Sequence, residues 1–99
     1  MISEIIIEII KAIPPGKVMS YGQVAASAGL VNSARTVARI LHSSSRKHHL
    51  PWWRVVRSNG EIALPEEAGG TLQMELLLSE GVAFKSKHVV DLDLCRFPH

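Results

Sequence analysis

The chain has 99 residues, of which 46% are hydrophobic and 20% are charged, a composition typical of a folded domain rather than of a disordered chain. This length supports one hydrophobic core, so we expect a single domain over residues 1–99. No apolar stretch approaches the roughly 20 residues that cross a bilayer, and the start lacks the features of a signal peptide, which favours a cytoplasmic protein. The single cysteine, Cys95, cannot form an internal disulfide, which agrees with a reducing compartment.

Charge is distributed unevenly along the chain, although the formal net charge is only +2. Residues 9–60 contain eight Lys or Arg residues and no Asp or Glu, whereas the remaining segments contain all nine acidic residues. Solvated faces normally mix both signs, so the basic half indicates a surface that contacts a polyanion such as nucleic acid. The alternative is a basic surface without a partner.

A first helix is predicted between Ser3, which is placed to cap it, and Pro14, which ends it. Its isoleucines recur at intervals of three and four residues and predict an apolar stripe made by Ile5, Ile6, Ile9, Ile10 and Ile13.

A second and a third helix follow with a short turn between them. Ser20 and Gln23 have the spacing of a capping box, and Gly29 ends the second helix after Ala28. Asn32 or Ser33 is placed to cap the third helix. Its expected core side is Ala34, Val37, Ala38 and Leu41, and its expected outer side is Arg35 and Arg39. This pair is typical of a helix-turn-helix, whose second helix enters a groove of DNA.

A small β wing is predicted after the third helix. Residues 42–50 (HSSSRKHHL) read as a polar, basic loop, and residues 54–57 and 61–64 as two strands joined by an Asn-Gly turn. The fold class is therefore mainly α with a small β wing, a winged helix-turn-helix-like DNA-binding domain.

A last helix is predicted over residues 71–80, with leucines too evenly spread to face water on any side. The segment 85–99 has no evident partner, and we expect a loosely held tail.

Four segments, taken in order, resemble the DNA-binding domain of the O6-alkylguanine-DNA alkyltransferases over residues 13 to about 84. They are IPPGKVMSYGQVAASAG, SARTVARIL, LPWWRVVRSNG and LLLSEGV. In that family the motif at residues 51–55 reads Pro-Cys-His-Arg-Val, and its cysteine accepts the alkyl group. Tryptophan in place of that cysteine is the mark of the alkyltransferase-like proteins, which usually keep the histidine. The resemblance implies a monomer that binds O6-alkylguanine in duplex DNA by flipping the nucleotide and flags it for nucleotide excision repair.

Trp52 stands at the acceptor position, and its indole is neither ionisable at neutral pH nor nucleophilic enough for alkyl transfer. The resemblance thus implies a binding protein and not an enzyme. Trp53 replaces the histidine that relays the proton in the family. Glu80 matches the acid that orients that histidine, so we expect it to have lost this partner and to serve only as a cap or in a salt bridge.

The resemblance and the basic third helix together predict two sets of site residues. The DNA-binding set is Tyr21, Ala34, Arg35, Ala38, Arg39 and Ser44, and the lesion-pocket set is Trp52, Trp53, Arg54 and Val55.

Arg35 matches the arginine that fills the gap left by the flipped base; the alternatives are a phosphate contact or a solvated side chain. Tyr21 matches the tyrosine that crowds the 3′ phosphate, and packing at the helix start is its alternative. Small Ala34 and Ala38 would allow close approach in the minor groove, and Arg39 would reach phosphate.

Trp52 offers a flat apolar wall on which a flipped base can stack. Trp53 is expected to pack in the core, and Arg54 to hold the loop by donating to backbone carbonyls. The segment 64–68 lacks the tyrosine that hydrogen-bonds the lesion base in the alkyltransferases, which favours broader or weaker lesion selectivity.

Three other interpretations remain open from the residues. A winged-helix transcriptional regulator would need Asn or Gln on the recognition helix to read base edges, and residues 33–42 contain neither. Alkyl transfer through Cys95 lacks an adjacent activating base. His42, His48 and His49 lack a cysteine or carboxylate to complete a metal site, so we expect no metal and no cofactor.

Overall fold

The computed structural model describes residues 2–98. The helices are α1 (Ile2–Lys11), α2 (Tyr21–Ser27), α3 (Ala34–His48), α4 (Gly70–Ser79) and α5 (Leu92–Cys95), with 3₁₀ turns η1 (Trp52–Arg54) and η2 (Glu66–Ala68). The strands are β1 (Met19–Ser20), β2 (Val55–Val56), β3 (Phe84–Ser86) and β4 (Val89–Val90). Within residues 2–98, no helix has the length and apolar character needed to span a membrane.

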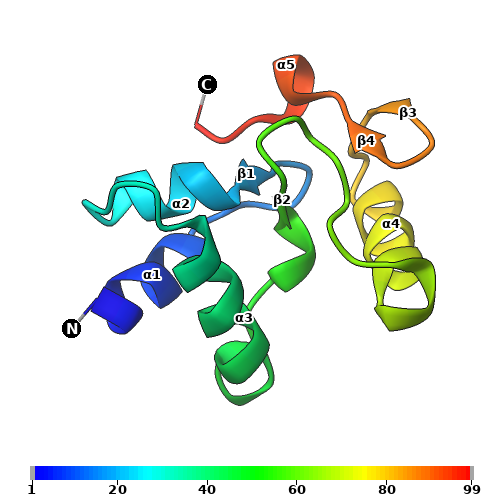
Figure 1. Ribbon diagram of the computed structural model, residues 1–99. Helices are drawn as coiled ribbons and strands as arrows, with labels where there is room; N and C mark the ends of the chain where they lie inside the picture. Colours follow the sequence, from blue (N-terminus) through cyan, green and yellow to red (C-terminus); the bar gives the residue numbers. More distant parts are fainter. Residues whose placement is uncertain (1, 99) are drawn as a thin grey trace.

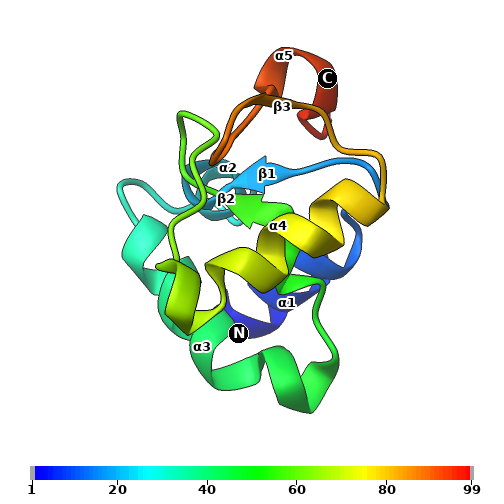
Figure 2. The same cartoon turned by 90° about the vertical axis from the view of Figure 1, so that its right-hand side faces the viewer.

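A two-stranded parallel sheet, β1 with β2, lies between two groups of elements (Figure 1). Helices α1, α2 and α3 lie on one side of it, and α4 with the β3–β4 hairpin lies on the other. Alternate residues of a strand point to opposite faces. Val55 accordingly joins the hydrophobic cluster of the first group, and Val56 joins that of the second. Figure 2 shows α4 in front of this sheet.

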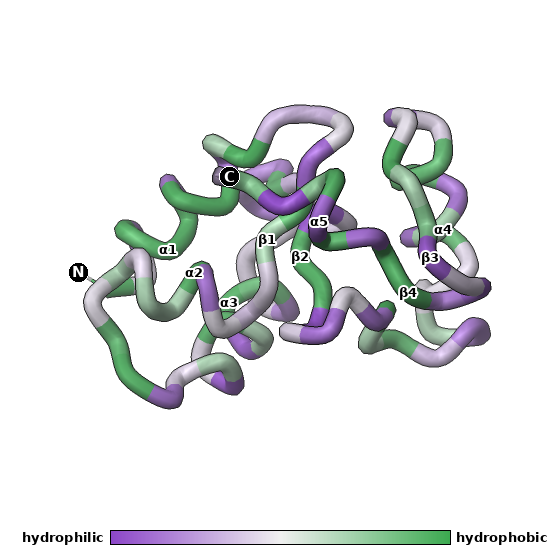
Figure 3. The backbone as a smooth tube through the Cα atoms, turned by 90° about the horizontal axis from the view of Figure 1, so that it is seen from above, coloured by the Kyte–Doolittle hydropathy of each residue, from purple (hydrophilic) through white to green (hydrophobic). Residues whose placement is uncertain are grey.

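Helix α1 packs through a stripe that differs from the predicted one. Ile6, Ile10 and Ile13 are buried as predicted, but Ile5 is 47% exposed and Ile7 is buried instead. The six isoleucines of α1, which give it its hydrophobic stretches in Figure 3, lie on more than one side of the helix, so periodicity alone permits more than one face to be buried. Contact with α2 and α3 selects the face that is buried.

The predicted start of α2 is confirmed in atomic detail. Ser20 Oγ accepts from the backbone N–H of Gln23, and Gln23 Oε1 accepts from the N–H of Ser20, each over 3.0 Å. These bonds satisfy amide donors that a helix start leaves free.

Helix α3 is longer than predicted, because residues 42–48 continue the helix instead of forming a loop. No Gly or Pro interrupts the segment, and Arg46, Lys47 and His48 in the last turn complement the negative end of the helix dipole. The helix ends at His49, whose backbone is left-handed (φ 52°).

The predicted wing is wrong in its pairing. The turn forms, since Gly60 N donates to Arg57 O over 2.8 Å, but the segment 61–64 does not return as a strand beside β2. Glu61 instead forms a single bridge with Val89. Gly60 (φ 89°) is required at this turn, since a Cβ there would collide with Val90 O.

The predicted all-round burial of the last helix is also wrong, because Leu72 and Leu78 of α4 are exposed. The prediction of a loosely held segment is wrong for residues 85–98, because β4 pairs with β3 and because Val90 and Cys95 are buried in the second hydrophobic cluster. Val18 N donates to Cys95 O and Phe97 N donates to Val18 O, each over 2.8 Å, which lays the tail along β1.

Candidate nucleic-acid interface

Trp52 lines a cavity of about 630 Å³ between α2, α3 and the start of α4, which we call the Trp52 cavity. Its lining residues are Tyr21, Ala38, Leu41, His42, Ser45, Arg46, Trp52, Leu64, Ala68, Gly69, Leu72 and Gln73. The walls are mainly apolar, His42 and Arg46 supply the basic groups, and no lining residue is acidic. A volume between about 300 and 1,000 Å³ with a few polar groups is typical of small-ligand sites.

A second cavity, of about 620 Å³, lies on the other side of Tyr21. Ala34, at the start of α3, and Arg57 and Ser58, after β2, are among its lining residues. Tyr21 therefore separates two hollows beside the recognition helix. Burial raises the pKa of the Tyr21 hydroxyl while nearby Arg57 opposes the shift, so the phenol is neutral and able to donate at physiological pH.

A basic stripe runs along the exposed side of α3. Arg35, Arg39, His42 and Arg46 are separated by four, three and four residues, the spacing that places side chains on one helix face. All four are exposed, and none has a hydrogen-bond or ion-pair partner among residues 2–98. The three unpaired arginines on this face provide the positive charge that phosphates require.

His42 and Arg46 are absent from the predicted DNA-binding set, because residues 42–50 read as a loop in the sequence. Continuing the helix from Arg35 would have placed both on the Arg35 face. The same extension corrects the prediction for Ser44. Nine residues after Arg35 correspond to about two and a half turns, so Ser44 lies on the opposite side of α3.

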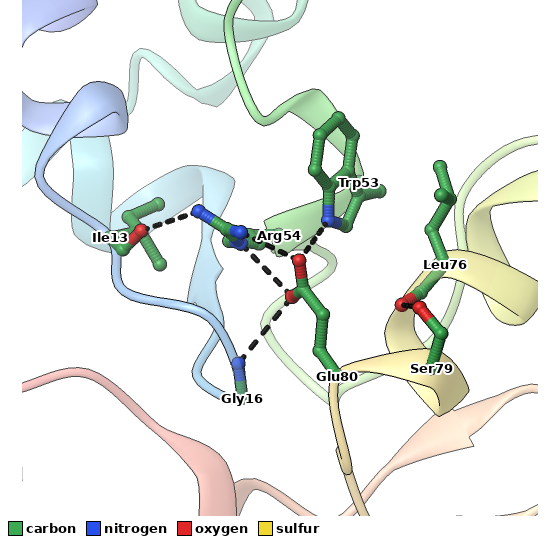
Figure 4. A network of polar contacts seen from close by, with 7 residues as sticks. All are labelled: Ile13, Gly16, Trp53, Arg54, Leu76, Ser79 and Glu80. Atoms are coloured by element: carbon green, nitrogen blue, oxygen red, sulfur yellow. Dashed lines mark hydrogen bonds and ion pairs between the residues drawn. The ribbon is translucent and has the colours of Figure 1, made fainter.

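Glu80 is the centre of a partly buried polar network (Figure 4). Its carboxylate accepts from Trp53 Nε1 over 3.0 Å and from Arg54 Nη2 and Nε over 2.6 and 3.0 Å. The N–H of Gly16 donates to the same group over 3.4 Å, and Arg54 Nη1 donates to Ile13 O over 2.8 Å. The expected carbonyl contact of Arg54 is present, and Glu80 forms the expected type of salt bridge, with Arg54. The expectation that position 53 no longer provides a partner for Glu80 is wrong. The Trp53 indole supplies a ring N–H to it.

The network is nearly closed to solvent, since the side chains of Arg54 and Glu80 are 12% and 14% exposed. Burial alone raises the pKa of Glu80, but the hydrogen bonds from Arg54, Trp53 and Gly16 outweigh it and lower the pKa below its usual value. Glu80 is therefore ionised at neutral pH and ties α4 to η1 and to the turn after α1.

Trp53 packs against the ring of Trp52. The two indole rings meet edge to face at 88°, with centroids 5.9 Å apart, and the Arg54 guanidinium lies 5.3 Å from the centre of the Trp53 ring. Such contacts contribute about 0.5–1.5 kcal/mol each. The orientation of Trp52 is thus linked to the Glu80 network.

The predicted lesion-pocket residues separate into two roles. Trp52 lines the cavity, whereas Trp53 and Arg54 lie behind it in the network and Val55 is fully buried in the core. The assignment of these last three residues to the pocket lining is therefore corrected, whereas the expected core packing of Trp53 and the expected carbonyl contact of Arg54 are confirmed. Tyr21 and Ala38, predicted for DNA contact, line the cavity with Trp52.

His42, His48 and His49 belong to no metal-like cluster, since residues 2–98 contain no group of three or more His, Cys, Asp or Glu side chains suited to an ion.

A helix-turn-helix pair with a basic face beside an aromatic-walled cavity defines a DNA-binding domain with a pocket for an extruded nucleotide. The chain belongs to the family described as "6-O-methylguanine DNA methyltransferase, DNA binding domain", whose profile matches residues 2–82. The resemblance inferred from the four motifs is thereby confirmed.

Two curated relatives and one solved structure illustrate the likeness. The chain is 39% identical over 92 residues to the DNA base-flipping protein of Escherichia coli, covering 91% of this chain and 69% of the relative. It is 38% identical over 71 residues to alkyltransferase-like protein 1 of Schizosaccharomyces pombe, covering 71% and 66%. The structure of S. pombe Atl1 in complex with damaged DNA containing O6-carboxymethylguanine superposes with a TM-score of 0.85 at 28% identity, covering 98% of this chain and 95% of that one. The winged-helix-like fold class is confirmed.

Proposed function

We propose that this protein recognises O6-alkylguanine in duplex DNA by rotating the damaged nucleotide into the Trp52 cavity, where it binds the base without repairing it. The observation that carries the proposal is the position of Trp52, in the wall of a cavity that opens beside the basic face of α3. The relatives named for base flipping, and the related structure bound to damaged DNA, support the same function.

Stacking on the Trp52 ring offsets part of the free energy that is lost when a base is rotated out of the duplex. Unstacking a base costs a few kcal/mol, and stacking on an aromatic side chain returns about 1–3 kcal/mol per base. Apolar Leu64 and Leu72 extend the wall and suit an O-alkyl group better than the polar O6 and N1–H edge of guanine. Arg35, exposed one turn before Arg39, is positioned on the face that would enter the duplex.

The residues at the acceptor and relay positions provide no route to alkyl transfer. The indole of Trp52 has no ionisable nucleophile, and the N–H of Trp53 is a donor held by Glu80 rather than a base. Cys95 is 5% exposed and belongs to the second hydrophobic cluster, away from the cavity lining. We therefore infer that the protein is a binding protein and not an enzyme.

A bound lesion that is not repaired must be passed to another process. We propose nucleotide excision repair as the recipient, acting on a complex of one protein molecule with DNA in the cytoplasm. The basis is the resemblance to the alkyltransferase-like proteins, and the basic face of α3 accounts only for the DNA contact.

The test measures the affinity for damaged and intact duplexes and also whether an alkyl group is transferred to the protein. Fluorescence anisotropy titrations compare matched duplexes that contain one O6-methylguanine or one guanine, and we expect at least about tenfold tighter binding of the lesion. After prolonged incubation, mass spectrometry should find the protein mass unchanged and O6-methylguanine recovered intact. Equal affinities would reject the recognition function, and a methyl group gained by the protein would show it to be a transferase.

A further inference from the structure

Gln73 is a buried amide in the contact of α4 with η1. Its side chain is 2% exposed, and its Nε2 donates to Trp53 O over 3.1 Å and to Val55 O over 3.0 Å. An amide nitrogen has two hydrogens, and both are used by these backbone carbonyls. The opposite orientation would place the amide oxygen against two acceptors, so the orientation of the Gln73 amide is unambiguous.

The amide oxygen of Gln73 has no hydrogen-bond partner among residues 2–98. Within the same part of the chain, no fully buried side-chain oxygen lacks a partner, so Gln73 Oε1 retains access to open space. Gln73 is only 2% exposed in total, and it is one of the residues that line the Trp52 cavity. The small exposed area of its side chain therefore faces this cavity. The cavity therefore contains a fixed, unpaired acceptor.

We propose that Gln73 Oε1 accepts a hydrogen bond from the exocyclic 2-amino group of the damaged base. The proposal deepens the proposed function and rests on it. Alkylation at O6 leaves N1 without a hydrogen, and N9 is bonded to deoxyribose. The 2-amino group is then the single N–H donor of an O6-alkylguanine. The acceptor selects for it because a buried polar group left unpaired is unfavourable.

This contact defines the substrate class as purines that carry a 2-amino group and an O6-alkyl group. An O4-alkylthymine has no N–H donor on its base, so it would leave Gln73 Oε1 unpaired. Apolar Leu64 and Leu72 receive the alkyl group without regard to which base carries it, whereas Gln73 distinguishes the bases.

The first test changes the DNA and leaves the protein unaltered. Dissociation constants are measured for matched duplexes with O6-methylguanine, O6-methylhypoxanthine or guanine at one position. O6-methylhypoxanthine lacks only the 2-amino group, and we expect about 5- to 10-fold weaker binding of it than of O6-methylguanine. Removing the amino group also weakens pairing and eases rotation, so a loss of affinity reports a lost contact with the protein.

The second test changes the residue. Gln73→Lys retains a donor for Trp53 O and Val55 O but has no acceptor, so it should bind both methylated duplexes with equal affinity. Glu75→Gln, an exposed change on α4 outside the cavity lining, should keep the wild-type ratio. If thermal unfolding shows that Gln73→Lys does not fold, Gln73→Met, which also lacks the amide oxygen, replaces it in the same comparison.

The outcomes separate the two proposals. Equal binding of O6-methylguanine and O6-methylhypoxanthine by the wild type, with both preferred over guanine, would overturn the role of Gln73 and leave lesion recognition in place. No preference of the wild type for O6-methylguanine over guanine would overturn the proposed function itself.

Discussion

The indole Nε1 of Trp53 donates a hydrogen bond to Glu80 Oε2 over 3.0 Å and thereby links the 3₁₀ turn η1 to the end of α4. The same indole meets the ring of Trp52 edge to face. Two adjacent tryptophans therefore have different tasks. Trp52 lines the cavity, and Trp53 connects Trp52 to Glu80 and so fixes the orientation of the Trp52 ring.

Trp53→Phe removes the ring N–H and keeps an aromatic edge beside Trp52. We expect a loss of about 1 kcal/mol in the free energy of unfolding, because Glu80 Oε2 loses one donor. Lesion preference should fall by less than in a variant without the Trp52 ring. Urea denaturation and anisotropy titration measure the two effects, and Trp53→His, which restores a ring N–H, is the matched control. An unchanged free energy of unfolding in Trp53→Phe would show that the hydrogen bond to Glu80 does not stabilise the fold.

Glu80→Gln should lower the free energy of unfolding at pH 7 by about 2–3 kcal/mol, less than for a fully enclosed pair, because Arg54 loses its anionic partner. The pKa of Glu80 is lower in the folded protein, so its contribution is complete above the ordinary value of 4.5 and is lost as pH falls through the folded-state pKa. The stability difference between wild type and Glu80→Gln should therefore shrink below about pH 4.5. A difference that stays constant down to strongly acid pH would contradict the assignment.

Arg35 and Arg39 should differ in their effects on DNA binding. Arg35→Ala is expected to weaken binding of lesion and plain duplex alike by about tenfold, because the rotated state loses the group that fills its gap. Arg39→Gln should reduce the slope of log affinity against log salt concentration by about 0.9, the loss of one phosphate contact. Lys47→Gln is the control, because Lys47 is an exposed cation of α3 that is rotated about a third of a turn around the helix axis from Arg35. This change should alter neither quantity. Unchanged affinity in Arg35→Ala would reject its role.

Trp52→Cys restores a thiol at the acceptor position, but we expect no efficient methyl transfer. Trp53 offers a donor and no base to take the thiol proton, and the carboxylate of Glu80 is already bound by Arg54. The measurement is the protein mass after incubation with O6-methylguanine duplex, with Trp52→Cys/Trp53→His as the comparison. Rapid methylation of the single variant would mean that another group deprotonates the thiol.

Local patterns in the sequence predicted the parts of the fold that depend on neighbouring residues. The Ser20–Gln23 capping box is confirmed because both partners lie within one helical turn. The end of α3 was missed, since a serine- and histidine-rich segment has no apolar period although it contains no helix breaker. The parallel pairing of β1 with β2 was also missed, because strands of two residues are too short to show alternation.

The site was predictable where a motif places a residue and not where tertiary contacts do. Trp52 and Tyr21 came from motifs and line one cavity. The bond between Trp53 and Glu80 joins positions 27 residues apart, and nothing in either segment encodes it. Gln73 was detectable in principle as the single amide in an apolar helix, but its role depends on the carbonyls of η1 and β2.

The most direct test of the central claim compares Trp52→Ala with the wild type on O6-methylguanine and guanine duplexes. Loss of the stacking wall should weaken lesion binding by about 1–3 kcal/mol and leave binding of the intact duplex within error, so that the preference disappears. A Trp52→Ala variant that folds and still prefers the lesion would show that the base does not rest on this indole, and the account of the cavity would be wrong.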